Sequence, residues 1–207
     1  MKKIPTMFVR EFEGHKIVCI RDEFTSPECE DALKNGKATV KFDGACCMID
    51  EDQQLWIRYD AKKGRKIPEG AIPCCDPDPV TGHWPHWVPA SSNLDGYKWY
   101  IKASEKMVIK EPGTYEAVGK HFNGNPYNLE TDFLIRHGLA TAGLKDSERS
   151  FEGIKAYLND IPVEGIVFWA NGEPVCKIKR TDFGYEWPLK SKVAAENILN
   201  AVEEVNE

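Results

Sequence analysis

The sequence predicts an α+β protein whose strands pair antiparallel. Two patterns indicate hairpins: apolar runs at 45–49 and 54–60 flank an acidic turn, and two further apolar runs flank Asn171-Gly172. Helical spacing of apolar residues is found at 154–161 and again at 194–205. These patterns predict antiparallel sheets with helices packed outside them.

The elements of the first half are predicted by alternation and by turn residues. Residues 15–21 alternate apolar and polar side chains, which predicts a strand. The polar stretch 28–36 ends in Asn-Gly and predicts a turn into the strand that carries Lys41. The hairpin of 45–60 follows. Residues 68–89 hold six prolines and few periodic apolar positions, so we expect a long loop there.

The second half is predicted by the same signals. Residues 97–108 alternate aromatic and polar side chains weakly, and their state is ambiguous, whereas 114–120 predicts a strand and 132–139 is a short apolar run. Ser150 is a capping residue at the start of a predicted helix that runs to Ile161. The remaining expected elements are two strands and a closing helix, at 163–169, 174–179 and about 190–206.

Length and composition indicate one folded body. With 207 residues the chain is predicted to form a single domain over 1–207. A net charge of −6 argues against non-specific coating of nucleic acid, although a local basic channel is compatible with it. Seven cysteines, four of them in adjacent pairs, indicate reduced thiols. Because no apolar signal core or bilayer-length run is found, we expect a cytoplasmic protein.

Lys41 is the first candidate catalytic residue. It follows a β-branched run and precedes Phe42, Asp43 and Gly44, which makes a Lys-x-Asp-Gly pattern with a turn pair. The end of a strand can present its amine to a cleft. Only the deprotonated amine is a nucleophile, so desolvation or neighbouring cations must lower its pKa from about 10.4. Taken alone, the pattern fits a solvated surface lysine as well.

The hairpin around Asn-Gly carries a second group of charges. Lys177 and Lys179 alternate along one predicted strand and therefore share a face, and Glu164 begins the partner strand. Two ammonium groups on one face repel each other unless an anion lies between them, and a phosphate is such an anion. The pair would lower the pKa of Lys41, and Glu164 could hold a divalent metal. Singly, both lysines also fit a solvated strand face.

The order of the charged segments carries a resemblance. Lys41-x-Asp43-Gly44, then Glu116, then Glu164-Gly165, then Lys177-Ile178-Lys179 resembles the covalent nucleotidyltransferases, the superfamily of nucleic-acid ligases and capping enzymes. Within it, the chain resembles most the ATP-dependent 5′-to-3′ RNA ligases of the kind found in vertebrates. The blocks behind this narrower resemblance are 41–47, 55–58, 84–89, 123–127, 163–167 and 186–188.

This resemblance implies a fold and a reaction. The fold is an α+β nucleotidyltransferase domain, the ATP-grasp-like adenylation domain of DNA and RNA ligases, with antiparallel sheets around an ATP cleft and helices outside. The reaction is ATP-dependent RNA ligation: Lys41 forms a covalent lysyl–AMP intermediate, AMP passes to an RNA 5′-phosphate, and a 3′-hydroxyl displaces it. RNA repair is the implied role, by a monomer that uses ATP and Mg²⁺ (or Mn²⁺) and binds RNA ends but no membrane.

The resemblance also implies roles for single residues. Lys41, Lys177, Lys179 and Glu164 are the implied catalytic residues, with Glu164 also the implied metal ligand. Glu116 would face the ribose, and Arg58 would grip the ribose or the RNA 5′-phosphate because a guanidinium binds two phosphate oxygens. The implied nucleotide-binding set is Thr39, Val40, Lys41, Asp43, Gly44, Arg58, Glu116, Glu164, Lys177 and Lys179, with the backbone at Thr39 and Val40 reading the adenine edge.

Alternatives remain open for the activity and for the adenine contact. A DNA ligase or an mRNA capping guanylyltransferase would share the chemistry of Lys41, and a non-catalytic RNA-binding module would need none of it. The aromatic that stacks on adenine is one of Phe122, Tyr127 and Phe133.

Alternatives also remain for the basic and metal-ligating side chains. The Lys62–Lys66 cluster is a solvated face or an RNA backbone contact. Cys74-Cys75 with His83 and His86 offers zinc ligands without the Cys-x-x-Cys spacing that suits one ion, so buried thiols are favoured. His121 and His137 could contact the nucleotide, but we favour loop histidines whose hydrogen bonds are made within the protein.

Overall fold

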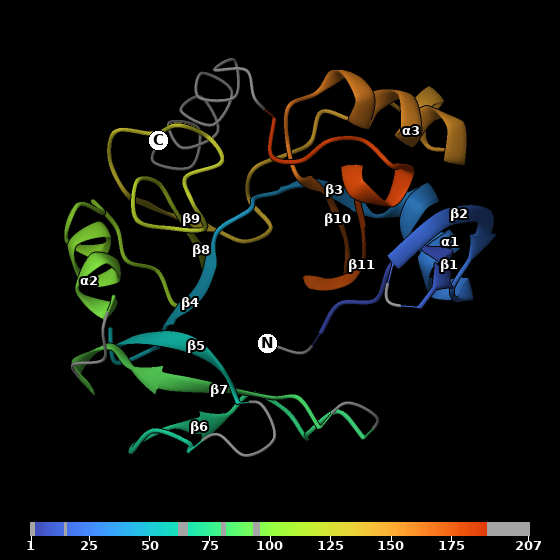
Figure 1. The fold of residues 1–207 in the computed structure, drawn as a ribbon. Helices are drawn as coiled ribbons and strands as arrows, with labels where there is room; N and C mark the ends of the chain where they lie inside the picture. The colour runs from blue at the N-terminus through green and yellow to red at the C-terminus, as the bar shows by residue number, and fades with distance from the viewer. Residues whose placement is uncertain (1–2, 15, 62–65, 80–81, 93–95, 190–207) are drawn as a thin grey trace. The chain divides into compact units, whose positions relative to one another are not determined.

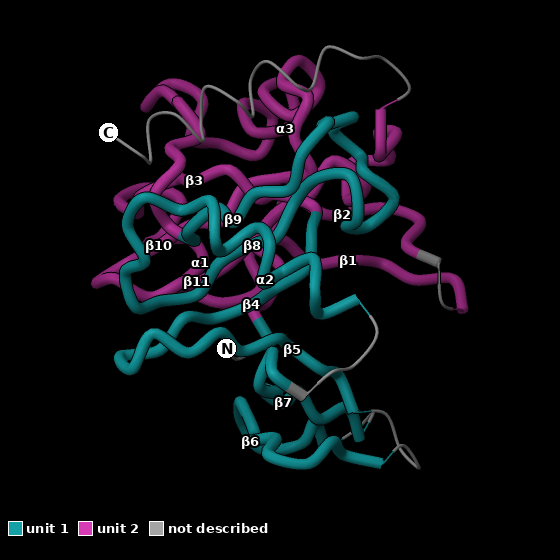
Figure 2. The backbone as a smooth tube through the Cα atoms, turned by 90° about the vertical axis from the view of Figure 1, so that its left-hand side faces the viewer, with its two compact units in different colours: residues 1–3, 44–137, 206 teal, residues 4–43, 138–205, 207 magenta. Residues whose placement is uncertain are grey.

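The computed structural model describes residues 3–14, 16–61, 66–79, 82–92 and 96–189. These form two compact units (Figure 2), one built from residues 44–137 and the other from 4–43 and 138–189. The expected helix at 190–206 lies outside the described residues, and a single domain over 1–207 stays a prediction.

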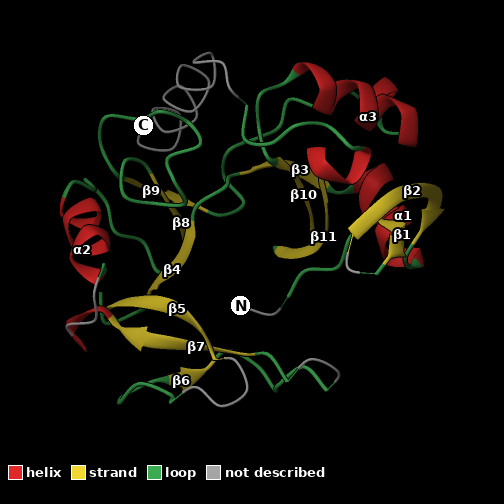
Figure 3. Ribbon diagram, viewed as in Figure 1, coloured by secondary structure: helices red, strands yellow, loops and turns green. Residues whose placement is uncertain are grey.

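The unit of residues 44–137 is built on one antiparallel sheet of six strands (Figure 3), in the order β6-β7-β5-β4-β8-β9. One α-helix, α2, accompanies it. The elements are β4 (Ala45–Ile49), β5 (Leu55–Ala61), β6 (Ile72–Pro73), β7 (Trp84–Pro89), α2 (Tyr97–Glu105), β8 (Gly113–Val118) and β9 (Phe133–Arg136).

The two faces of this sheet differ in character. Cys47 and Tyr115 are opposite each other in the β4–β8 register, and both pack in an apolar core that includes Ala103 of α2. Side chains alternate along a strand, so the neighbouring pair Cys46 and Glu116 lies on the opposite face. The sheet therefore buries one face under α2 and carries polar groups on the other.

The unit of residues 4–43 and 138–189 holds a three-stranded antiparallel sheet, β11-β10-β3, and a separate two-stranded hairpin, β1-β2 (Figure 1). Its core includes Met7, Phe8, Ile154, Leu158 and Ile166, all fully buried. The elements are β1 (Phe8–Glu13), β2 (Lys16–Phe24), α1 (Pro27–Asn35), β3 (Lys37–Lys41), α3 (Phe151–Asp160), β10 (Gly165–Ala170) and β11 (Glu173–Lys179).

Most of the predicted strands and hairpins are confirmed. The runs at 45–49 and 54–60 form the antiparallel pair β4–β5, and the Asn171-Gly172 turn joins β10 to β11. Asn171 and Gly172 have φ angles of 52° and 80°. A two-residue hairpin turn requires such positive φ values, which asparagine and glycine adopt most readily. The ambiguous stretch 97–108 contains the helix α2.

The predicted turn at 28–36 is wrong, because residues 27–35 form the helix α1. Pro27 is at the first helical position, where its missing N–H is tolerated, and Glu28 and Glu30 place negative charge in the first turn. Cys29 and Leu33 are four residues apart and both buried. The helix is thus stabilised by a buried apolar face. The prediction of a turn missed this face because it considered only the overall polarity of the stretch.

The predicted loop at 68–89 is wrong where two strands form: the short edge strand β6, and β7, which takes up the last six residues and is second in the sheet. β7 pairs with β5 along its whole length, whereas β6 reaches only Trp87 and His86. Pro85 and Pro89 therefore fall on rows that β6 leaves unpaired, where a missing N–H is tolerated.

The predicted helix at 150–161 is confirmed as α3, and its N-cap gives a stability prediction. The Ser150 hydroxyl accepts a hydrogen bond of 3.1 Å from the Gly153 N–H. Ser150→Ala should lower the free energy of unfolding by about 1 kcal/mol, measured by denaturant titration. Exposed Ser147, in the preceding turn, is the matched control, and Ser147→Ala should change it by less than about 0.5 kcal/mol. Equal losses in both variants would refute the capping role.

Candidate active site

Lys41 is the last residue of β3, as the sequence predicted. In the three-stranded sheet, Gly165 of β10 lies opposite Lys41 on one side and opposite Lys179 of β11 on the other. A Cβ at residue 165 would lie 2.2 Å from the Ile178 carbonyl oxygen, so only glycine fits. The two lysines thus flank a position without a side chain and project from the same face of the sheet.

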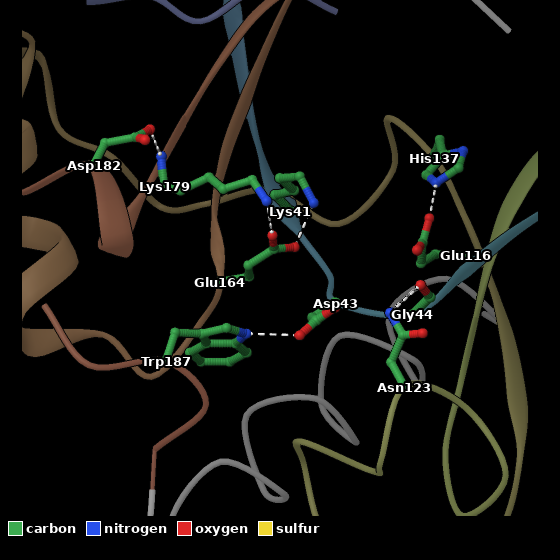
Figure 4. Close-up of polar contacts among 10 residues, drawn as sticks. All are labelled: Lys41, Asp43, Gly44, Glu116, Asn123, His137, Glu164, Lys179, Asp182 and Trp187. Atoms are coloured by element: carbon green, nitrogen blue, oxygen red, sulfur yellow. Dashed lines mark hydrogen bonds and ion pairs between the residues drawn. The ribbon is translucent and has the colours of Figure 1, made fainter. Parts of the chain in front are cut away.

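Glu164 precedes β10 and joins the two lysines. Its Oε2 atom accepts a hydrogen bond from Lys41 Nζ, and its Oε1 atom accepts one of 2.5 Å from Lys179 Nζ. Figure 4 shows the two ammonium groups converging on this carboxylate. Glu164 is only 5% exposed, so little water competes for these contacts. The carboxylate therefore fixes the position of both amines.

Lys177 lies on the same face, two residues before Lys179, as the alternation predicted. Burial, together with the neighbouring ammonium groups of Lys41 and Lys179, lowers the pKa of Lys177 from the ordinary lysine value of 10.5 to about 8. The sequence did not single out Lys177 for this effect. The cluster holds three amines against one carboxylate and therefore attracts anions.

Two carboxylates make hydrogen bonds beside the lysine cluster. Asp182, which is buried, accepts a hydrogen bond of 2.8 Å from the Lys179 N–H at the end of β11. Asp43 accepts one of 2.8 Å from the indole Nε1–H of Trp187. The sequence block around Trp187 had no predicted role. Trp187 therefore holds the side chain of Asp43, next but one to Lys41.

Thr39 and Val40 are held by bonds inside their own unit. Thr39 is 1% exposed, and its hydroxyl accepts a hydrogen bond of 2.8 Å from the Trp169 indole. The Val40 N–H donates to the Ala140 carbonyl at 2.9 Å. A contact of these residues with adenine stays a prediction.

The remaining predicted site residues belong to the six-stranded sheet. Gly44 precedes β4, and its carbonyl accepts a hydrogen bond of 2.6 Å from the Asn123 side chain. Arg58 on β5 pairs with Asp60 at 3.1 Å. The Glu116 carboxylate on β8 is hydrogen-bonded to His137 Nε2 at 2.8 Å. Their functional roles stay predictions.

His137 was expected to be a partnered loop residue, and it has partners within its own unit. Its two ring nitrogens are both engaged, Nε2 with Glu116 and Nδ1 with the Thr114 hydroxyl at 3.0 Å. Burial, together with the Glu116 carboxylate, raises the pKa of the nearby Cys46 thiol to about 12. The pairing of an acidic strand residue with a histidine 21 positions later had no local signal in the sequence.

A Mg²⁺ ion at Glu164 would need one of its carboxylate oxygens. Both oxygens accept hydrogen bonds from lysines, so the ion would have to displace one ammonium group. Mg²⁺ uses one or two carboxylates and otherwise keeps water and phosphate ligands, so a single Glu164 oxygen would suffice.

Comparison with known proteins points to RNA ligases. No protein-family model matches the chain. The chain is similar to RNA ligase 1 of Rattus norvegicus, with 29% identity over 174 residues, and the match covers 66% of this chain and 49% of the rat protein. Identity with RNA ligase 1 of Pongo abelii is 28% over 161 residues, 59% of this chain and 48% of the relative.

The similarity extends to a fish and has a consistent span. Identity with RNA ligase 1 of Danio rerio is 26% over 151 residues, covering 58% of this chain and 45% of the relative. The chain spans about half the length of the relatives it matches. This similarity supports a relationship with RNA ligases, and the antiparallel α+β architecture agrees with the predicted class. None of the helices among the described residues has the length and apolar character of a membrane span.

Proposed function

We propose that the chain is an ATP-dependent RNA ligase that works through a covalent lysyl–AMP intermediate. The observation that carries the proposal is the cluster around Glu164, in which one buried carboxylate holds Lys41 and Lys179 beside Lys177. The similarity to proteins named RNA ligase 1 supports RNA as the substrate class. Sealing of a 5′-phosphate to a 3′-hydroxyl in cytoplasmic RNA repair belongs to the same proposal.

In the first step, the Lys41 amine attacks the α-phosphorus of ATP. A nitrogen–phosphorus bond forms, the bond from the α-phosphorus to the bridging oxygen breaks, and pyrophosphate leaves. Glu164 Oε2 already accepts a hydrogen bond from Lys41 Nζ, so it is placed to take the proton that the nucleophile must lose. Lys177 and Lys179 stabilise the charge that develops on the phosphate oxygens.

Glu164 has a second task in this proposal, which is to position the amines before ATP binds. Three ammonium groups on one face would repel each other without a counter-anion. The Glu164 carboxylate is that counter-anion in the free protein. When ATP binds, the α-phosphate oxygens take over some of its contacts with the ammonium groups. Mg²⁺, if held by one Glu164 oxygen, would supply neutralisation of the phosphate charge.

The second and third steps move the AMP group and then release it. The terminal oxygen of an RNA 5′-phosphate attacks the α-phosphorus, a pyrophosphate bond forms, and the Lys41 nitrogen leaves. A 3′-hydroxyl next attacks the RNA phosphorus, a phosphodiester forms, and AMP leaves with the bond electrons. Arg58 is the proposed contact for the ribose or the 5′-phosphate, because its guanidinium can bind two phosphate oxygens at once.

A mass-spectrometric experiment tests this function. The protein is incubated with Mg²⁺ and either ATP or GTP, and the modified peptide is mapped. We expect AMP on Lys41 and no GMP. GMP on Lys41 would indicate a capping enzyme and not a ligase. If a folded protein forms no adduct with either nucleotide, the proposal is overturned.

Strand substrates then separate the polynucleotide classes. The adenylated protein is given nicked or single-stranded RNA, or DNA of the same sequence, each with a 5′-phosphate and a 3′-hydroxyl. RNA joining with little DNA joining is the expected result. Preferential DNA joining would convert the proposal to a DNA ligase, and an adduct that joins neither would leave RNA ligation refuted.

A further inference from the structure

Three neighbouring strands of the six-stranded sheet bring together a thiol, a carboxylate and an imidazole. Cys46 of β4 is directly opposite Glu116 of β8. His137 follows β9, and its N–H donates to the Thr114 carbonyl at 3.0 Å, which fixes its place beside β8. The ligand atoms of the three side chains all lie within 4.8 Å of one another.

These side chains lie on the polar face of the sheet, opposite the core under α2. All three are partly buried, so a bound ion would be shielded from water while one side stays accessible. Strand pairing sets the backbone of Cys46 and Glu116, and the hydrogen bond from the His137 N–H to Thr114 holds His137 beside the same strand.

The donor set selects a class of metal. Thiolate and imidazole ligands suit borderline ions such as Zn²⁺, whereas Mg²⁺ and Ca²⁺ prefer oxygen ligands alone. In a tetrahedral Zn²⁺ site with bonds of about 2.0–2.3 Å, neighbouring ligand atoms lie roughly 3.5 Å apart. Small rotations of the three side chains would bring them from their present separations to this value.

We propose that Cys46, Glu116 and His137 form a Zn²⁺ site with a fourth coordination position left for water or another ligand. Three protein ligands with an open position are the pattern of reactive zinc sites and not of closed structural ones. The proposal concerns metal binding and does not depend on the proposed ligase function.

The surroundings of the site support a bound cation. The Thr114 hydroxyl lies 3.0 Å from His137 Nδ1, and such an outer contact orients a metal-ligating imidazole so that Nε2 faces the ion. A thiolate and a carboxylate together balance the charge of Zn²⁺. Arg58 is the neighbouring cation that acts on Cys46, and Asp60 partly neutralises it at 3.1 Å.

The site differs from the zinc ligands considered from the sequence. The sequence offered a different group of possible zinc ligands, the adjacent Cys74-Cys75 with His83 and His86. Among the residues that the structure describes, the one group of metal-ligating side chains close enough to share an ion is Cys46, Glu116 and His137. Register across strands, and not spacing along the chain, brings this group together.

Cobalt spectroscopy tests the site without any nucleotide. The full chain is stripped with a chelator and titrated with Co²⁺, whose thiolate complexes have a sulfur-to-metal charge-transfer band. We expect the band to saturate at one equivalent and to disappear on addition of Zn²⁺. Cys46→Ser should remove the band, and Glu116→Gln and His137→Gln should each weaken binding by at least about tenfold.

Two cysteine variants serve as matched controls. Cys47→Ala alters the neighbouring thiol, which faces the apolar core, and Cys19→Ser alters an exposed thiol of the other unit. Both should keep the band, and thermal unfolding should confirm that every variant is folded. Absence of the band in the wild-type chain, its persistence in Cys46→Ser, or unchanged affinity in both Glu116→Gln and His137→Gln would overturn the proposal.

Discussion

Lys41→Ala is expected to abolish AMP adduct formation, by at least about 10³-fold, because the substitution removes the only atom that forms the covalent bond. The fold should survive. Glu164 keeps Lys179 as a partner at 2.5 Å, so the variant does not leave a buried carboxylate unpaired. Mass spectrometry after incubation with ATP and Mg²⁺ measures the adduct, and thermal unfolding measures the fold.

Lys37→Ala is the matched control for this prediction. Lys37 begins the same strand, is exposed, and donates a hydrogen bond of 2.7 Å to the Gly138 carbonyl. Its loss should leave adduct formation within about twofold of wild type, since surface substitutions have small effects. An adduct that persists in folded Lys41→Ala, or that is lost equally in Lys37→Ala, would mean that another group is the nucleophile.

Local signals predicted the parts of the site that lie on one hairpin. The alternation of Lys177 and Lys179 on one strand follows from the period of two, and the Asn171-Gly172 turn fixes the hairpin that carries them. Lys41 at a strand end was predicted in the same way, because a β-branched run stops at the Asp-Gly pair. These features depend on neighbours along the chain, which a sequence displays directly.

Long-range contacts were beyond such signals. The bond between Lys41 and Glu164 joins residues 123 positions apart, and the bond between Trp187 and Asp43 spans 144. The strand β7 also escaped prediction, because pairing with β5 outweighs the low strand propensity of Pro85 and Pro89. In each case the partner that decides the structure is supplied by another part of the fold.

The second large effect is expected for Lys177→Met. Methionine keeps much of the side-chain volume and removes the ammonium group, so phosphate attraction is lost while packing is largely retained. Adduct formation should fall by about 10²-fold, the usual loss when one group that stabilises developing charge is removed. Raising the pH should not restore the rate, because the missing interaction is with phosphate and not with a proton.

The same substitution should change how stability depends on pH. The pKa of Lys177 is about 8 in the folded protein and has an ordinary value of 10.5. The unfolded chain therefore binds this proton more readily, and the charged group opposes folding fully below pH 8 and not at all above pH 10.5. Methionine removes this penalty. Lys177→Met should therefore have a higher melting temperature than wild type at pH 7, and most of that difference should disappear by pH 10.

Melting temperatures of the wild type, Lys177→Met and Lys37→Met across pH 6–10 separate this effect from the titration of other groups. Lys37 is an exposed lysine of the same sheet, so its replacement should give a difference from wild type that does not vary with pH. A pH-independent difference for Lys177→Met as well would show that the Lys177 amine is not destabilised by burial. If Lys177→Met forms the adduct at the wild-type rate, the phosphate contact belongs to Lys179 instead, because Lys179 is the other lysine of β11 on the same face.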